Sequence, residues 1–289
     1  MGVISENNKR IVKNTLLLYV RMIFTMVVSL YTSRIVLATL GIDDYGIYNV
    51  VGGVVAMFSV LSGSLSSAIS RFITFELGHG DSKRMKLIFS TSIIIQIVMA
   101  FVVLLVAEIA GVWFINEKMN IPNDRLFAAN WVLQCSILTF IINLISVPYN
   151  ATIIAHEKMS AFAYVSILEV ILKLLIVYLL YMSSYDRLIV YALLLMLVAL
   201  VIRVVYGIYC KKHFAEASYS LIWDRNVFNE MLRFAGWNFL GNTSYILNTQ
   251  GVNMLINLYF GVALNAARGI AVQVDGAVMS FVNNFTVAL

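Results

Sequence analysis

The chain has 289 residues, of which 61% are apolar and only 12% charged, and its mean hydropathy is +0.88. A soluble domain carries about 25% charged residues, and a fold of this size has no core large enough to hide so many apolar side chains from water. Composition therefore excludes a water-soluble protein. The formal charge of +5 comes from scattered basic residues, which excludes a nucleic-acid-binding face.

Apolar runs of about 20 residues, the length that a helix needs to cross a bilayer, recur along the chain. We predict eight membrane-spanning helices, at residues 12–38, 47–70, 87–112, 127–150, 160–182, 188–210, 233–258 and 267–289. The fold class that follows is an all-α integral membrane protein, a multi-pass helical bundle.

Lysine and arginine are unequally divided between the two sets of connections. The set that includes the N-terminus holds eleven of these residues and the opposite set holds three. Because positive residues are retained on the cytoplasmic side, we predict a cytoplasmic N-terminus and, for a bacterial chain, the inner membrane as location.

The longest polar connection, residues 211–232, divides the chain into a six-helix lobe at 1–210 and the first two helices of an incomplete second lobe at 233–289. Within this connection Asp224 is placed to cap a short interfacial helix. A shift of 220 residues aligns Gly41 with Gly261 and little else, a weak sign of an internal repeat. Since the chain stops inside an apolar helix, we expect a fragment of a longer protein.

Ionisable side chains inside a bilayer cost about 2.5–3.5 kcal/mol each and so mark candidate sites. Arg21 shares a helical face with Thr25 and Ser29. This row predicts the wall of a polar cavity with a cation for an anionic ligand, and the alternative is an arginine that reaches to the headgroups. In the second span, Ser66 belongs to a small-residue row typical of close helix packing, and Arg71 follows near the inner headgroups.

Glu169 and Lys173 lie four residues apart in the fifth span. Two interpretations stand: an ion pair that neutralises itself, or a carboxylate that couples cation movement to transport. Asp275 in the last span, seven residues after Arg268, is a further candidate for ion coupling.

The seventh span carries a stripe of amide and hydroxyl side chains on one helical face. These groups suit either the hydroxyls of a sugar in a wet cavity or hydrogen bonds between helices, and both remain open. The stripe consists of Asn238, Asn242, Tyr245, Thr249, Asn253 and Asn257.

The sequence contains no P-loop, no cluster of residues with metal-ligand spacing and no nucleophile with a plausible base. We therefore predict no enzyme activity, no cofactor and no metal, and favour movement of a molecule across the membrane.

The segment 33–78 contains Ser33-Arg34, Leu40-Gly41, Tyr45-Gly46-Ile47-Tyr48, a Ser/Gly-rich helix and Arg71-Phe72. This order resembles the beginning of the polysaccharide-export and lipid-linked oligosaccharide flippases (Wzx-like) of the MATE-like superfamily. The resemblance implies a MATE-like six-helix lobe followed by part of a second lobe, with a central cavity and alternating access. It also associates arginines on the first, second and eighth helices with a lipid diphosphate, for which Arg21, Arg71 and Arg268 are the candidates here.

The expected function is to flip a polyprenyl-diphosphate-linked oligosaccharide to the outer leaflet for cell-surface polysaccharide, such as O-antigen, capsule or exopolysaccharide. The implied partners are this substrate, membrane lipids, and polysaccharide polymerase and assembly proteins. One alternative is a cation-coupled multidrug antiporter of the same superfamily, with Glu169 or Asp275 binding the cation. A second is a non-transporting scaffold for polysaccharide-assembly enzymes.

Overall fold

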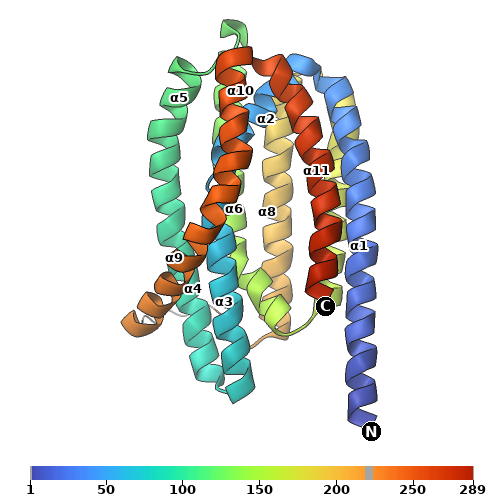
Figure 1. The fold of residues 1–289 in the computed structure, drawn as a ribbon, viewed down its shortest axis with the longest axis vertical. Helices are drawn as coiled ribbons and strands as arrows, with labels where there is room; N and C mark the ends of the chain where they lie inside the picture. Colours follow the sequence, from blue (N-terminus) through green and yellow to red (C-terminus); the bar gives the residue numbers. More distant parts are fainter. Residues whose placement is uncertain (1, 219–223, 289) are drawn as a thin grey trace.

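The structure is a computed structural model that describes residues 2–218 and 224–288. Every element within these ranges is helical, and the helices form an elongated bundle (Figure 1). The elements are α1 (Gly2–Leu40), α2 (Ile42–Ala56), α3 (Ser59–His79), α4 (Ser82–Val106), η1 (Ala107–Gly111), α5 (Val112–Glu117), η2 (Asn123–Arg125), α6 (Leu126–Ala155), α7 (Met159–Met182), α8 (Arg187–His213), α9 (Arg225–Ile246), η3 (Leu247–Gly251), α10 (Val252–Phe260) and α11 (Val262–Ala288).

The fold class predicted from composition is confirmed: the chain is a multi-pass helical membrane protein. Five of the described helices are long and apolar enough to cross a membrane, namely Leu16–Leu40, Ser82–Glu117, Asn123–Ala155, Met159–Met182 and Arg187–His213. Their outward side chains include Phe101, Ile109 and Tyr181, which are 61%, 74% and 80% exposed. In a bilayer such side chains contact lipid. The many apolar residues are therefore accommodated without a larger protein core.

Three predicted spans are less regular than the sequence indicated. The span predicted at 47–70 is wrong as a single helix, because the chain forms a turn at Met57 and Phe58 between α2 and α3. The spans predicted at 87–112 and 233–258 each contain a π-helical segment, η1 and η3. Apolar run length reports the thickness to be crossed but not the hydrogen-bond register inside the helix.

Two turns at the same end of the bundle share an unusual backbone geometry. Gly41, between α1 and α2, has φ 85° and ψ 173°, and Gly261, between α10 and α11, has φ 83° and ψ −174°. This region of backbone space is essentially restricted to glycine. These are the two glycines that the 220-residue shift aligns, so the predicted repeat is matched at this turn. We call the end that holds both turns the outer end, following the predicted topology.

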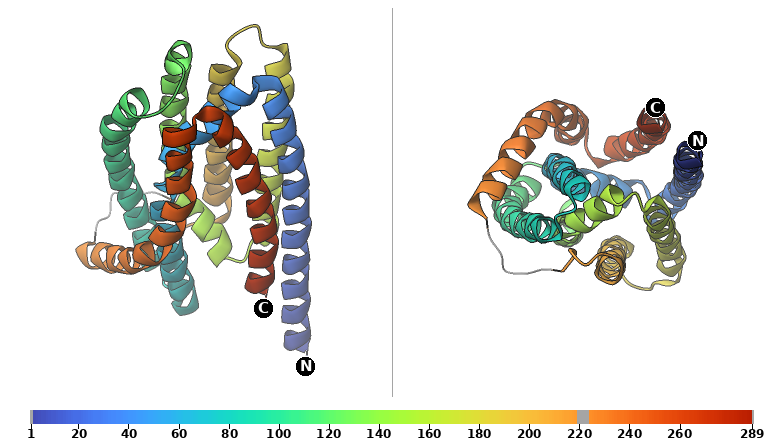
Figure 2. Two further views of the ribbon diagram at one scale, coloured as in Figure 1. Left: turned by 45° about the horizontal axis from the view of Figure 1, so that its top comes forward. Right: turned by 90° about the horizontal axis from the view of Figure 1, so that it is seen from below.

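The short interfacial helix predicted after Asp224 is not a separate element. The Asp224 carboxylate accepts hydrogen bonds from the backbone N–H groups of Asn226 (2.7 Å) and Val227 (3.2 Å), as expected of a cap. The helix that it caps is α9, which continues into the predicted seventh span and begins at a steep tilt to the bundle (Figure 2). Val227 and Met231 are buried against α3, and this packing holds the tilted segment in place.

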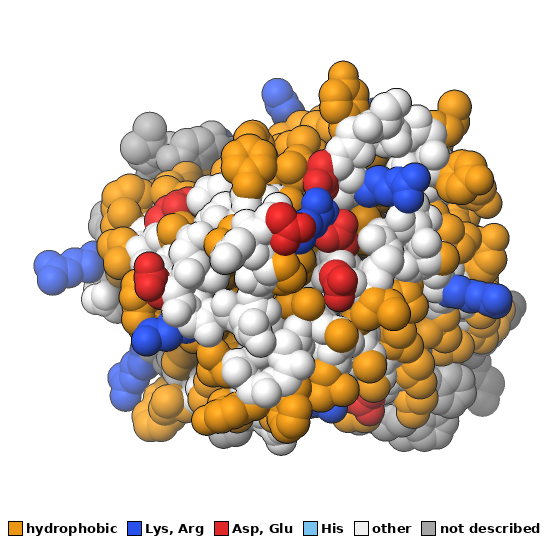
Figure 3. All heavy atoms as spheres, turned by 90° about the horizontal axis from the view of Figure 1, so that it is seen from above, with side chains coloured by type: hydrophobic (Ala, Val, Ile, Leu, Met, Phe, Trp, Pro, Cys, Tyr) orange, Lys and Arg blue, Asp and Glu red, His pale blue; other side chains and the backbone are white. Residues whose placement is uncertain are grey.

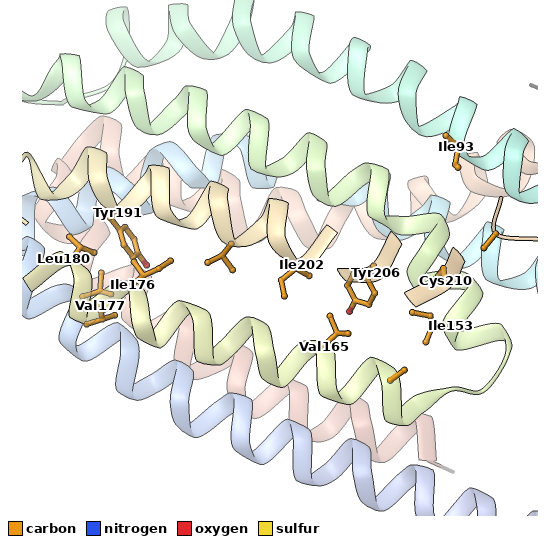
Figure 4. Packing of buried hydrophobic residues seen from close by; sticks show 14 of the residues in the cluster. Ile93, Ile153, Val165, Ile176, Val177, Leu180, Tyr191, Ile202, Tyr206 and Cys210 are labelled. Atoms are coloured by element: carbon orange, nitrogen blue, oxygen red, sulfur yellow. The ribbon is translucent and has the colours of Figure 1, made fainter. Parts of the chain in front are cut away.

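A large hydrophobic cluster lies mainly between α7 and α8. Figure 4 shows Ile176, Val177 and Leu180 of α7 beside Tyr191 of α8, with Ile202 further along the same interface. These five side chains are at most 9% exposed. The cluster fixes α7 and α8 relative to each other, and both helices contribute to the cavity described next.

Candidate functional site

A cavity of about 580 Å³ is lined by residues of α1, α2, α7, α8 and α11. We call it the central cavity. Its lining mixes hydroxyl, amide and aromatic groups with apolar side chains. The polar and aromatic members are Thr25, Ser29, Thr32, Ser33, Tyr45, Tyr48, Asn49, Lys173, Tyr191 and Gln273.

Helix α1 supplies one wall because its hydroxyl residues recur at helical spacing. The Thr25 hydroxyl donates to the Met22 carbonyl (2.9 Å) and the Ser33 hydroxyl to the Leu30 carbonyl (3.0 Å). These hydrogen bonds to the helix's own backbone use the hydroxyl hydrogens as donors, but the lone pairs of the hydroxyl oxygens can still accept. The wall therefore presents hydrogen-bond acceptors to the cavity.

Helix α11 closes the cavity against α1. The Gln273 side-chain amide donates to both the carbonyl oxygen (3.1 Å) and the hydroxyl oxygen (2.9 Å) of Ser29. On the α2 and α8 side, the rings of Tyr48 and Tyr191 meet edge to face with centroids 4.9 Å apart. The two predicted parts of the chain, 1–210 and 233–289, thus share one cavity.

Of the predicted cavity residues, the structure places Thr25 and Ser29 in the lining. Lys173, which the sequence suggested for ion coupling, lies there too. Sequence reasoning missed Asn49 and Gln273. Asn49 is an amide within the apolar stretch 46–56, which is a signal that could have identified it. Gln273 became recognisable only through its contact with α1.

The three candidate arginines do not meet in one place. Arg21 lies one helical turn before Thr25, where its Nη1 atom donates to the Ser166 hydroxyl (3.4 Å) and its guanidinium lies 4.7 Å from the Phe162 ring centroid. Arg268 is half-buried on α11. The Nε atoms of Arg21 and Arg268 are buried and have no hydrogen-bond partner among the described residues.

Arg71, the third arginine, lines a separate pocket between α3 and α9. That pocket shares no residue with the lining of the central cavity. A common diphosphate site for all three arginines stays a prediction, and the described conformation keeps them apart.

The charged pair in the fifth span is formed. Lys173 Nζ donates to Glu169 Oε1 at 2.6 Å, and the two side chains are 44% and 38% exposed. Among the described lining residues Lys173 is the charged one. Asp275 is exposed on α11 and lies outside the lining.

The amide stripe of the seventh span makes contacts within the protein. Asn253 Nδ2 donates to Gln250 Oε1 (3.0 Å), and Gln250 Oε1 would lie 3.0 Å from a Cβ placed on Gly53 of α2. Asn257, the next polar residue of the stripe, is fully buried and accepts a hydrogen bond from the Asn120 backbone N–H (3.0 Å). For Asn253 and Asn257 these contacts agree with the helix-packing interpretation.

Three other predicted polar residues do not line the central cavity. Ser66, Asn238 and Thr249 lie outside its lining, and the side chains of Asn242 and Tyr245 fall outside the described residues.

Helices α2 and α11 pack closely at the outer end of the cavity. A Cβ on Gly46 would lie 2.1 Å from the Val262 carbonyl oxygen, and a Cβ on Gly269 would lie 2.6 Å from the Asn49 side chain. The contact at Gly46 is with backbone, so glycine is required there, whereas at Gly269 a larger residue would have to displace the Asn49 side chain. We call this contact between α2 and α11 at the outer end the outer seal.

An ion-pair cluster joins three segments at the same end. Arg125 donates from Nε to Asp44 (2.8 Å) and from Nη1 to Asp186 (2.7 Å). Figure 3, which shows this face, has acidic and basic side chains together near its middle. We call Arg125, Asp44 and Asp186 the outer cluster.

The two carboxylates of the outer cluster differ in acidity. Burial raises the pKa of Asp44 above its ordinary value, although Arg125 opposes the shift. Burial acts in the same direction on Asp186, but the hydrogen bonds from Arg125 and from the Ile189 and Leu188 backbone N–H groups outweigh it and lower the pKa. Arg125 donates to both carboxylates, so the difference in pKa comes from the burial of Asp44 and from the backbone hydrogen bonds to Asp186.

The fold and the cavity define a multi-pass helical membrane protein with a polar interior. The chain belongs to the family described as polysaccharide biosynthesis protein, whose family model matches residues 11–288. The family predicted from residues 33–78 is therefore confirmed.

The chain is 21% identical over 160 residues to the "Uncharacterized membrane protein EpsK" of Bacillus subtilis (strain 168), a match that covers 55% of this chain and 31% of that protein. A solved structure called "protein A" superposes with a TM-score of 0.75 at 14% identity, covering 97% of this chain and 63% of that chain. This likeness shows the fold. The matches thus span about a third of the curated relative's length and under two thirds of the solved chain's.

Proposed function

We propose that the chain forms part of a flippase that carries a polyprenyl-diphosphate-linked oligosaccharide from the cytoplasmic to the outer leaflet. The observation that carries this proposal is the polar central cavity inside an otherwise apolar bundle of a polysaccharide biosynthesis protein. A polar cavity within a bilayer-spanning bundle is unfavourable unless it is wet or holds a polar ligand. The glycan headgroup is such a ligand.

The lining suits the two chemical parts of this headgroup. Ser29, Asn49 and Gln273 offer acceptors and amide donors of the kind that sugar hydroxyls bind, and the tyrosine rings offer flat apolar faces. Lys173 in the lining and Arg21 beside it supply positive charge for the diphosphate through charge-assisted hydrogen bonds. The lipid tail stays in the bilayer.

In this proposal, the outer seal indicates which conformation of the transport cycle the structure represents. The close approach of α2 and α11 at Gly46 and Gly269 supports the interpretation that this conformation is closed at the outer end. Transport requires this contact to separate, so that the headgroup leaves toward the outer leaflet. In this proposal the segments 1–210 and 233–289 belong to two lobes that rock about the cavity, with the N-terminus in the cytoplasm.

The test compares two arginines of the same helix. Arg21→Gln removes the cation beside the cavity, whereas Arg34→Gln removes an exposed arginine near the outer end of α1 that lies outside the lining. Losing one charge-assisted contact of about 1.5–3 kcal/mol lowers flipping by roughly 10- to 150-fold. The measurement is the rate at which a labelled lipid-linked oligosaccharide becomes accessible on the far side of reconstituted vesicles.

Each outcome has a defined meaning. Loss in Arg21→Gln with normal flipping in Arg34→Gln supports the proposal, and equal rates in both variants remove Arg21 from the mechanism. Absence of flipping by the wild type, with proton-driven efflux of a cationic dye instead, supports the antiporter alternative. Normal polysaccharide export by a correctly inserted Ser29→Trp variant with a filled cavity supports the scaffold alternative.

A further inference from the structure

A second pocket, of about 430 Å³, lies between α3 and α9 at the opposite end of the bundle from the outer seal. We call it the interfacial pocket. Its lining combines three charged side chains with aromatic ones: Arg71, Phe75, Glu230, Arg233, Phe234 and Trp237. The proposed function uses none of its contacts.

The depth of the pocket matches the boundary between headgroups and acyl chains. Arg71 lies eight residues before the last residue of α3, which is about 12 Å along the helix axis. Arg233 lies eight residues after the first residue of α9, which follows the basic connection predicted to be cytoplasmic. Tryptophan and arginine are enriched at this level of a membrane, and Trp237 is 72% exposed.

The charges of the pocket are not neutralised within the protein. Among the described residues, no salt bridge joins Arg71, Arg233 or Glu230 to a group of opposite charge, whereas such pairs form elsewhere, as between Arg84 and Glu76 (2.9 Å). The Arg71 guanidinium carbon lies 4.6 Å from the centroid of the Phe234 ring. This contact holds the guanidinium by its face and leaves the N–H edges free to donate.

We propose that the interfacial pocket binds the headgroup of a phospholipid that carries both a phosphate and a primary ammonium, the chemistry of phosphatidylethanolamine. The two guanidinium groups take the phosphate, and the Glu230 carboxylate takes the ammonium. Two positive charges and one negative charge are complementary to this pair. A purely anionic headgroup leaves the carboxylate unmatched and repelled.

The exposed aromatic side chains of the pocket favour a lipid over a free phosphate as the ligand. Phe75 and Trp237 are 61% and 72% exposed, so an acyl chain lying beside the pocket covers apolar surface that an inorganic phosphate leaves bare. The bound lipid contacts both α3 and α9, which lie in the two predicted lobes. Its occupancy therefore stabilises the contact between the lobes at the cytoplasmic end.

Trp237 provides the measurement. The protein is purified from its own membrane and reconstituted with phosphatidylethanolamine, phosphatidylglycerol or phosphatidylcholine that carries brominated acyl chains, which quench nearby tryptophan fluorescence. The part of the quenching that is lost in a Trp237→Phe variant comes from Trp237 and therefore reports lipid binding at this pocket. We expect phosphatidylethanolamine to reach half-maximal quenching at a lower lipid fraction than phosphatidylglycerol or phosphatidylcholine.

Two variants with a matched control separate the charges. Replacing both arginines (R71Q/R233Q) weakens binding about 30-fold, at roughly 1 kcal/mol for each basic residue near the membrane surface. Glu230→Gln abolishes the preference for phosphatidylethanolamine over phosphatidylglycerol while binding itself persists. The control K211Q/K212Q removes the same number of charges from exposed residues outside the pocket and leaves quenching unchanged.

Four results overturn the proposal. They are equal quenching by all three lipids, a Glu230→Gln variant that keeps the wild-type preference, full displacement by inorganic phosphate, and displacement by a polyprenyl diphosphate at equal concentration. The last result would instead assign Arg71 to binding of the transported substrate. If R71Q/R233Q shows no melting transition, it does not fold, and R71K/R233K, which retains the charges, is measured in its place. The preference of Glu230→Gln for phosphatidylethanolamine over phosphatidylglycerol is then compared in the same way. The outcome is independent of whether the protein flips a glycolipid.

Discussion

The seal between α2 and α11 is tested by adding a single methyl group. In Gly46→Ala the new Cβ would lie 2.1 Å from the Val262 carbonyl oxygen, so the helices must move about 1.3 Å apart to reach the 3.4 Å of an ordinary contact. The partner atom is backbone and cannot rotate away. Overpacking of this kind costs about 1–3 kcal/mol.

This strain acts only on the conformation that is closed at the outer end. If the open conformation separates α2 from α11, the same 1–3 kcal/mol shifts the equilibrium toward it by roughly 5- to 150-fold. The reporter is Ser33→Cys, a cavity position on α1, labelled from the outer side with a membrane-impermeant maleimide. The native cysteines, Cys135 and Cys210, are both buried.

Helix α2 supplies the matched control. A Cβ on Gly52 meets nothing within 4 Å, so Gly52→Ala makes the same chemical change without strain. We expect faster labelling of S33C/G46A and unchanged labelling of S33C/G52A. Equal labelling rates in the two backgrounds would refute the assignment of this contact as the outer seal.

Two further predictions concern groups that join segments at the outer end. Arg125→Gln leaves the two aspartates of the outer cluster unpaired and lowers the melting temperature well below that of the control Arg187→Gln, whose exposed arginine makes one bond to a carbonyl. The lowered pKa of Asp186 contributes stability that is fully present above its ordinary value of 3.8 and is lost as the pH falls below that value. The difference between the two variants is therefore the same at neutral and mildly acidic pH and shrinks below pH 3.8, and a difference that stays constant below that pH contradicts the ion-pair explanation. Asn257→Leu leaves the Asn120 N–H without its acceptor and destabilises the protein by about 1–3 kcal/mol, measured by denaturation in detergent, and an unchanged midpoint argues against that bond.

The sequence alone determined the class of protein and much of one cavity wall. Apolar run length specified helices because backbone groups in lipid must be satisfied within a segment. The spacing of Thr25 and Ser29 put both on one face of α1, and that face lines the central cavity. These inferences rest on local periodicity, which a sequence states directly.

The tertiary structure decided which polar residues meet. Gln273 and Ser29 are 244 positions apart, and Gly46 and Val262 are 216 apart, so no local pattern announces either contact. The family resemblance groups Arg71 with Arg21, yet the tilt of α9 gives Arg71 the neighbours Phe234 and Arg233 in a different pocket. Depth in the membrane follows from sequence position, but the direction a side chain faces depends on how the helices pack.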